Sequence, residues 1–182
     1  SFEESVPMEC GIDNGFGGYN RFVQLGSEDV VLAPVCFGEC ANCIINTPVN
    51  ITFQVNLAGQ TISPNGVHLA GSIQGWVPSS TEMTDDNSDG IYEVTLSATA
   101  GETYQFKFIN GNDWPQAESV PSECGINDGF GGYNRFVTAM SEDMVYGPVC
   151  FGSCESPACD VPFACNYNPN AVCVNNAVCS GF

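Results

Sequence analysis

The chain has 182 residues, of which 21 are Asp or Glu, three are Lys or Arg and one is His, giving a formal net charge of −18. Such a chain is repelled by nucleic-acid phosphates and by anionic membrane surfaces, which excludes both as partners. Eleven cysteines in so short a chain indicate an oxidising compartment. We therefore expect a secreted or cell-surface protein that does not insert into a membrane.

Short runs of alternating apolar and polar residues predict β-strands along most of the chain. In chain order, the predicted strands are residues 19–23, 29–33, 44–57, 67–73, 82–84, 91–96, 104–109, 133–138 and 143–146. Turn residues separate them, and no segment has a convincing helical pattern. Short strands at this spacing predict an all-β fold, an immunoglobulin-like antiparallel β-sandwich with a disulfide-rich C-terminal segment.

Two segments of the chain are near copies of each other. Residues 4–40 and 118–154 align without a gap and are identical at 27 of 37 positions. The copies are offset by 114 residues, which is about the size of one small domain and indicates modules in series. Residues 44–154 are then a complete module and residues 155–182 a Cys-rich tail. Residues 1–43 are the C-terminal part of a module, which another segment or subunit would complete because two strands alone are marginally stable.

The complete module carries six features in an order that resembles starch-binding and glycogen-binding β-sandwiches, over residues 49 to about 151. The features are a strand ending in Gly71, a loop at Trp76, a turn before Ile91-Tyr92, the strand Tyr104-x-Phe-Lys-Phe, Asn110-Gly111 before Trp114, and Asn134-Arg135 opening the next strand. The chain departs from that pattern after Trp114, where Pro115 follows and a glycine-rich loop, residues 125–132, comes before Asn134.

This resemblance implies a starch-binding-like fold and an exposed sugar platform made by Trp76, Lys107 and Trp114. Indole rings pack against the C–H faces of sugars, and a lysine can donate to hydroxyl groups. The alternative for Trp76 and Trp114 is that they pack under loops or against a neighbouring module. Exposure separates the two: indoles that lie coplanar and open to solvent favour a sugar site, and indoles buried in a contact between modules favour a fibre.

The repeated ending of the module is similar to tandem modules of large secreted bacterial surface proteins. The main hypothesis is therefore a non-enzymatic extracellular structural protein, a segment of a filament or surface adhesin that binds copies of itself. Head-to-tail assembly would use β-strand complementation and disulfides. The alternative is a carbohydrate-binding module that recognises an α-glucan-like polysaccharide through Trp76, Lys107 and Trp114. We assign no catalytic residue, because His68 lies in a strand with no nucleophile motif near it.

A short acidic segment matches the start of a calcium loop. It has the form Asp85-x-Asn87-x-Asp89-Gly90, although Leu96 stands where a bidentate glutamate would complete the loop. The same residues also fit a plain hairpin turn held by Asx side chains. Calcium at Asp85, Asn87 and Asp89 is thus the one cofactor that the sequence suggests.

Arg21 and Arg135 occupy the same position in the two copies of the repeat. In a chain with three cationic side chains, this recurrence predicts structural ion pairs, since a guanidinium can bind a carboxylate with two hydrogen bonds. The candidate partners are Glu4 or Asp13 for Arg21, and Glu118 or Asp128 for Arg135.

Two cysteines are separated by the same number of residues in each copy, which predicts one bridge per copy. These bridges are Cys10–Cys36 and Cys124–Cys150. Cys40 with Cys43, or Cys154 with Cys159, could close small loops. The odd number of cysteines leaves at least one that is free or bonded to another chain.

Overall fold

The computed structural model describes residues 4–22, 37–38, 47–57 and 59–159, together with residues 161, 162, 164, 168, 173–175 and 178–180. The chain divides into two compact units, Ser1–Ile45 and Asn46–Phe182. The regular structure in the described residues consists of β-strands and short 3-10 helices, and none of these helices is long or apolar enough to cross a membrane. The predicted all-β fold is confirmed.

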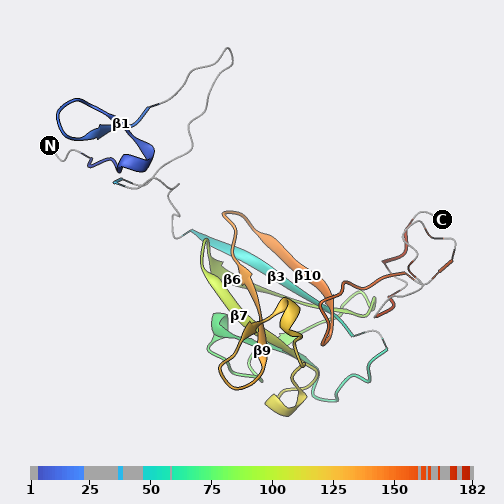
Figure 1. Cartoon of the computed structure of the whole chain (residues 1–182). Helices are drawn as coiled ribbons and strands as arrows, with labels where there is room; N and C mark the ends of the chain where they lie inside the picture. The colour runs from blue at the N-terminus through green and yellow to red at the C-terminus, as the bar shows by residue number, and fades with distance from the viewer. Residues whose placement is uncertain are drawn as a thin grey trace. The chain divides into compact units, whose positions relative to one another are not determined.

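The second unit is a sandwich of two sheets (Figure 1). The smaller sheet has the order β10–β3–β6, with β3 at Pro48–Asn56, β6 at Ile91–Thr99 and β10 at Met144–Cys150. The larger sheet has the order β5–β4–β7–β9–β8, with β4 at Val67–Gly71, β5 at Glu82–Met83, β7 at Thr103–Ile109, β8 at Ile126–Asn127 and β9 at Tyr133–Thr138. Among the described strand pairs, β3 with β10 is parallel and the others are antiparallel.

The core lies between the two sheets and follows from the alternation in their strands. Phe53 of β3 and Phe106 of β7 are fully buried, and their rings meet edge to face with centroids 4.8 Å apart. Burial of each such side chain stabilises the fold by about 1.5–3 kcal/mol. Because successive side chains of a strand point to opposite faces, burying Phe106 and Phe108 leaves Gln105 and Lys107 on the outer face of the larger sheet.

Strands β9 and β10 follow each other closely in the sequence but belong to different sheets. β9 pairs with β7, whereas β10 pairs with β3. The short connection after Thr138 therefore carries the chain from the larger sheet to the smaller one, and the repeated segment 118–154 spans both layers of the sandwich.

A buried ion pair joins β9 to neighbouring parts of both sheets. Nε and Nη2 of Arg135 donate to the two carboxylate oxygens of Glu118 at 2.8 and 2.7 Å. Glu118 also accepts the N–H groups of Phe108 at 3.0 Å and Gly152 at 2.9 Å, so it links β7 to the turn after β10. Burial disfavours the guanidinium cation, but the hydrogen bonds and charge of Glu118 outweigh it and raise the pKa of Arg135 above its ordinary value.

The first unit contains the same local elements as residues 122–134. The 3-10 helix η1 (Met8–Cys10) precedes strands β1 (Ile12–Asp13) and β2 (Tyr19–Asn20), which pair antiparallel. In the second unit, η4 (Ser122–Cys124) precedes the antiparallel pair β8–β9. The predicted strand 29–33 lies outside the described residues.

The ion pair also recurs in the first unit. Nε of Arg21 donates to the two carboxylate oxygens of Glu4 at 3.1 and 3.0 Å, and Glu4 accepts the N–H of Gly38 at 2.8 Å. These residues match Arg135, Glu118 and the glycine after β10 in the repeat. The exposed fractions differ, however: the two side chains are 27% and 23% exposed in the first unit but 1% and 0% in the second.

The disulfides correct one prediction. The described bonds are Cys124–Cys154, Cys150–Cys173 and Cys159–Cys179. The predicted Cys124–Cys150 bridge is therefore wrong, and so is a small loop closed by Cys154 and Cys159. Equal spacing could not decide the pairing, because Cys154 also recurs in the first copy, as Cys40. Cys10 is disulfide-bonded, and Cys36, its predicted partner, lies outside the described residues.

The Cys-rich tail is attached to the sandwich. Besides the Cys150–Cys173 bond, the side-chain amide of Asn175 donates to Oδ1 of Asn56 at 3.1 Å and to the carbonyl of Asp89 at 2.8 Å. Asn175 and Asn56 are both buried. These contacts fix the described part of the tail at the ends of β3 and β10.

Candidate functional site

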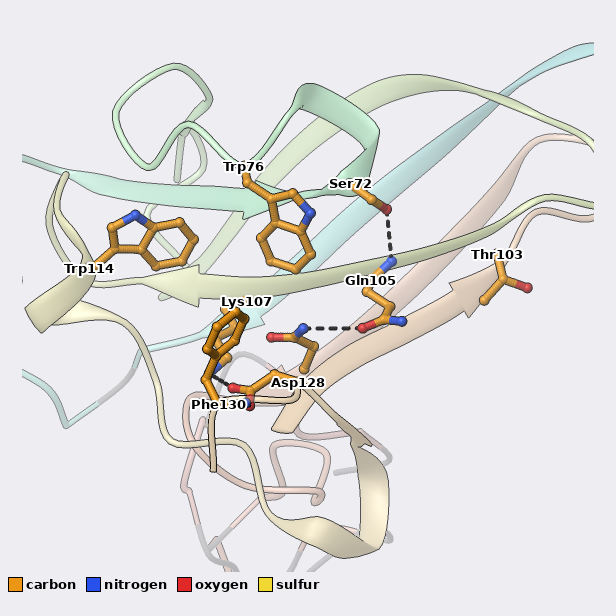
Figure 2. Close-up of a pocket in the computed structure, with 9 residues that line it drawn as sticks. Ser72, Trp76, Thr103, Gln105, Lys107, Trp114, Asp128 and Phe130 are labelled. Carbon is orange, nitrogen blue, oxygen red and sulfur yellow. Dashed lines mark hydrogen bonds and ion pairs between the residues drawn. The ribbon is translucent and has the colours of Figure 1, made fainter. Parts of the chain in front are cut away.

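An open groove of about 650 Å³ lies on the outer face of the larger sheet (Figure 2). This volume is within the range of about 300–1,000 Å³ that is typical of small-molecule sites. The residues that line it are Ser72, Trp76, Thr103, Gln105, Lys107, Trp114, Asp128, Phe130 and Asn134. The groove therefore brings together the three predicted sugar-platform residues, Trp76, Lys107 and Trp114, with six others.

Trp76 is presented by the loop that follows β4 and the 3-10 helix η2 (Ser72–Gln74). The side-chain amide of Gln74 donates to the carbonyls of Leu69 and Val77 at 3.0 and 2.8 Å and so braces the loop. Trp76 itself has φ 61°, in the left-handed region that a bulky residue rarely occupies. That backbone conformation costs on the order of 1 kcal/mol, and the braced loop maintains it with the indole on the groove.

Trp114 is presented by a second, independent loop after β7. It starts the 3-10 helix η3 (Trp114–Gln116), and its N–H donates to the side chain of Asp113 at 2.8 Å. The carbonyl of Gln116 accepts the N–H of Asn110 at 3.1 Å, which closes the loop. Glycine is favoured at Gly111, because its φ of 148° is a backbone conformation that other residues rarely adopt.

The two indoles form one broad apolar surface. Their ring centroids are 6.2 Å apart and their planes are tilted by 36°. Trp114 is 42% exposed and Trp76 is half-buried, and Figure 2 shows both rings over β7. Trp114 is thus the more open of the two indoles. The exposure of Trp114 agrees with the criterion set from the sequence for a sugar site, whereas the 36° tilt departs from the coplanar arrangement that was expected.

Lys107 stands on β7 in the floor of the groove, opposite a carboxylate from another loop. Its Nζ lies 3.5 Å from Oδ2 of Asp128, and both side chains are mostly buried. The N–H groups of Phe130 and Gly132 donate to Oδ1 of Asp128 at 2.8 and 2.9 Å. These N–H groups, together with Lys107, lower the pKa of Asp128 below its ordinary value. Asp128, a candidate partner of Arg135, thus pairs with Lys107 instead.

Polar side chains complete the groove beside the lysine. Oγ of Ser72 accepts the N–H of Gln105 at 3.1 Å, and the amide of Asn134 donates to Oε1 of Gln105 at 3.1 Å. The first hydrogen bond, to the backbone of Gln105, holds Ser72 on β7, and the second joins the two amide side chains to each other. Amides supply both donors and acceptors, which suits a ligand rich in hydroxyl groups.

The predicted calcium segment forms a closed turn between β5 and β6. The carboxylate of Asp85 accepts the N–H groups of Asp89 and Gly90, each at 2.9 Å, and the amide of Asn87 donates to Asp89 at 2.9 Å. The turn is thus held by the chain's own donors. No cluster of three or more His, Cys, Asp or Glu side chains arranged for a metal occurs among the described residues, and calcium here stays a prediction.

Sequence analysis missed Phe130, which lines the groove although it lies 16 residues beyond Trp114. The signal that could have identified Phe130 is the set of glycines that flank it in the sequence. A phenylalanine between glycines, in the run Gly-Phe-Gly-Gly, occurs at both Phe16 and Phe130. Both side chains are almost fully exposed, at 96% and 97%.

The chain is similar to one curated protein in sequence and to several solved structures in fold. No family model matches the chain. The chain is 29% identical to the α-amylase of Niallia circulans over 119 residues, which is 65% of this chain but 9% of that protein. Among solved structures, it is similar to a γ-CGTase of the alkalophilic Bacillus clarkii, with 24% identity, 57% of this chain and 15% of that chain covered, and a TM-score of 0.41. A family 20 CBM of a maltotetraose-forming amylase of Pseudomonas saccharophila matches with 18% identity, 54% of this chain and 100% of that chain covered, and a TM-score of 0.35.

The amylase match bears out the resemblance noted in the sequence and corrects the main functional hypothesis. The aligned relative is an α-amylase and not a fibre or adhesin subunit. A head-to-tail filament was therefore the wrong expectation, and the alternative, a carbohydrate-binding module, fits better. The filament hypothesis rested on the repeat, which suggested serial assembly, whereas six of the nine groove residues lie between the two copies.

Proposed function

We propose that the Asn46–Phe182 unit is a carbohydrate-binding module of an extracellular protein, which holds a neutral, α-glucan-like polysaccharide in the groove. The observation that carries this proposal is that Trp76 and Trp114, with centroids 6.2 Å apart, line one groove together with Lys107. Adjacent indoles offer apolar faces to successive sugar rings, while the amides of Gln105 and Asn134 supply hydrogen bonds to their hydroxyls. The similarity to an α-amylase supports an α-glucan as the ligand.

The charges of the groove support a neutral ligand. Lys107 and Asp128 are the two charged side chains among the lining residues, and they pair with each other. The net charge of the whole chain is −18, which repels an acidic polysaccharide. A neutral glycan avoids that repulsion and does not need to break the Lys107–Asp128 pair.

The groove is also suited to binding without catalysis. Glycosidases usually place two carboxyl groups about 5–9.5 Å apart around the scissile bond. Among the lining residues, Asp128 is the one carboxylate, and it is occupied by Lys107 and by two backbone N–H groups. The described disulfides suit the oxidising environment outside the cell.

Affinity electrophoresis in gels that contain soluble starch tests the proposal. The oxidised native protein should be retarded in proportion to the starch concentration, and replacing Trp114 by Ala should remove the retardation. A gel with polygalacturonate, an acidic polysaccharide, should leave the mobility unchanged. Equal mobility of the native protein with and without starch would refute an α-glucan ligand, and retardation by polygalacturonate alone would refute a neutral one.

A further inference from the structure

Phe130 lies at the tip of the loop between β8 and β9 and is 97% exposed. Large aromatic side chains are normally buried, because leaving them in water forgoes hydrophobic stabilisation. The ring nevertheless lines the same groove as Trp76 and Trp114, which come from two other loops. Figure 2 shows Phe130 beside Lys107, on the side of the groove away from the indoles.

The loop that carries Phe130 is built to hold a fixed shape. The side chain of Asn127 accepts the N–H of Gly129 at 2.8 Å, and Asp128 accepts those of Phe130 and Gly132. Gly129 and Gly131 flank the phenylalanine with φ of 79° and 95°, which favour glycine. The loop conformation is thus set by the four residues Asn127, Asp128, Gly129 and Gly131, and it does not depend on burial of the Phe130 ring.

One ion pair ties this loop to the groove floor. Oδ2 of Asp128, the oxygen that the backbone donors leave open, lies 3.5 Å from Nζ of Lys107. Lys107 stands on β7, so the pair anchors the loop to the central strand of the larger sheet. An exposed aromatic ring on an anchored loop, facing a groove that already has two indoles, is placed as a contact for a ligand.

We propose that Phe130 is a third aromatic sugar contact, which binds a ring of the same glycan chain beyond the rings held by Trp76 and Trp114. This inference rests on the proposed function and names a residue that determines how long a glycan chain the groove prefers. An apolar ring packs against the C–H face of a neutral sugar without needing a charged partner. Phe130 should therefore add affinity for long oligosaccharides and little for short ones.

The chain provides a matched control for this inference. Phe16 sits at the same repeat position in the first unit, on a loop of the same design, where Asn14 accepts the N–H groups of Phe16 and Gly18 at 2.8 and 3.1 Å. It is as exposed as Phe130 but does not line the groove. Both F16A and F130A remove an exposed ring, so neither should lower the melting temperature.

Isothermal titration calorimetry with maltoheptaose and maltotriose tests the inference. F130A should weaken maltoheptaose binding about tenfold and maltotriose binding by less than about twofold, since one aromatic contact is of that order. F130Y, which keeps the ring, should bind both as the native protein does, and so should F16A.

Three results would overturn this inference: native-like binding by F130A, an equal loss in F16A, or a loss in F130A that is the same for both oligosaccharides. If the native protein binds neither oligosaccharide, the proposed function fails, and the role of Phe130 fails with it. Binding by the native protein that F130A leaves intact overturns the role of Phe130 alone.

Discussion

Replacing Arg135 by Met should strongly destabilise the Asn46–Phe182 unit. The substitution leaves the Glu118 carboxylate, whose side chain is 0% exposed, with two backbone donors and no cation. Breaking a buried ion pair by removing one partner typically costs about 3–5 kcal/mol. A domain of about 140 residues has an unfolding entropy near 0.3 kcal/mol per kelvin, so the melting temperature should fall by roughly 10–17 °C.

Tryptophan fluorescence is a suitable probe for this melt. The chain has two tryptophans, Trp76 and Trp114, and both lie in the Asn46–Phe182 unit, so the signal reports this unit alone. R21M is the matched control, because it breaks the same ion pair in the first unit, where the two side chains are 27% and 23% exposed. R21M should barely change the fluorescence melt. A melting temperature of R135M as high as that of R21M would refute the reasoning that burial makes this pair structural.

Three further predictions concern covalent bonds, pH and calcium. Peptide mapping without reduction should recover the pairs Cys124–Cys154, Cys150–Cys173 and Cys159–Cys179, and a Cys124–Cys150 peptide would contradict the structure. Because the pKa of Asp128 is lowered, its carboxylate stabilises the Phe130 loop above the ordinary pKa of about 4, and this stabilisation is lost as the pH falls through the lowered value. Glycan affinity should then be constant from about pH 5 to pH 8 and fall below about pH 4; a fall within the neutral range would contradict this assignment. If calcium binds at residues 85–90, adding calcium to chelator-treated protein should raise its melting temperature, and D89N should abolish that rise. Equal melting temperatures of the native protein with and without calcium would refute the site.

The sequence predicted the strands whose alternation was clear. The strand at Thr103–Ile109 is an example, since its buried Phe106 and Phe108 and its outward Gln105 and Lys107 follow directly from a period of two. Alternation could not show that β9 and β10 belong to different sheets, because consecutive strands usually neighbour each other. Nor could it predict that β10 runs parallel to β3.

The site was only partly predictable for related reasons. Trp76, Lys107 and Trp114 could be named from the order of features along the chain, and the structure brings them into one groove. The pairing of Asp128 with Lys107 could not be predicted from the sequence, because Asp128 was also a plausible partner of Arg135. The position of the β8–β9 loop in the structure decides between the two. Phe130 was missed because glycine-flanked residues in a loop have no periodic pattern that indicates their direction.

The most direct test of the central claim is a fluorescence titration of the native protein with maltoheptaose. Both tryptophans line the groove, so a sugar that packs on them must change their emission. We predict a saturable change whose midpoint equals the dissociation constant from calorimetry, with W76F and W114F each losing part of the signal and much of the affinity. Calorimetric binding of maltoheptaose without any change in tryptophan emission would contradict the assignment of the groove as the carbohydrate site.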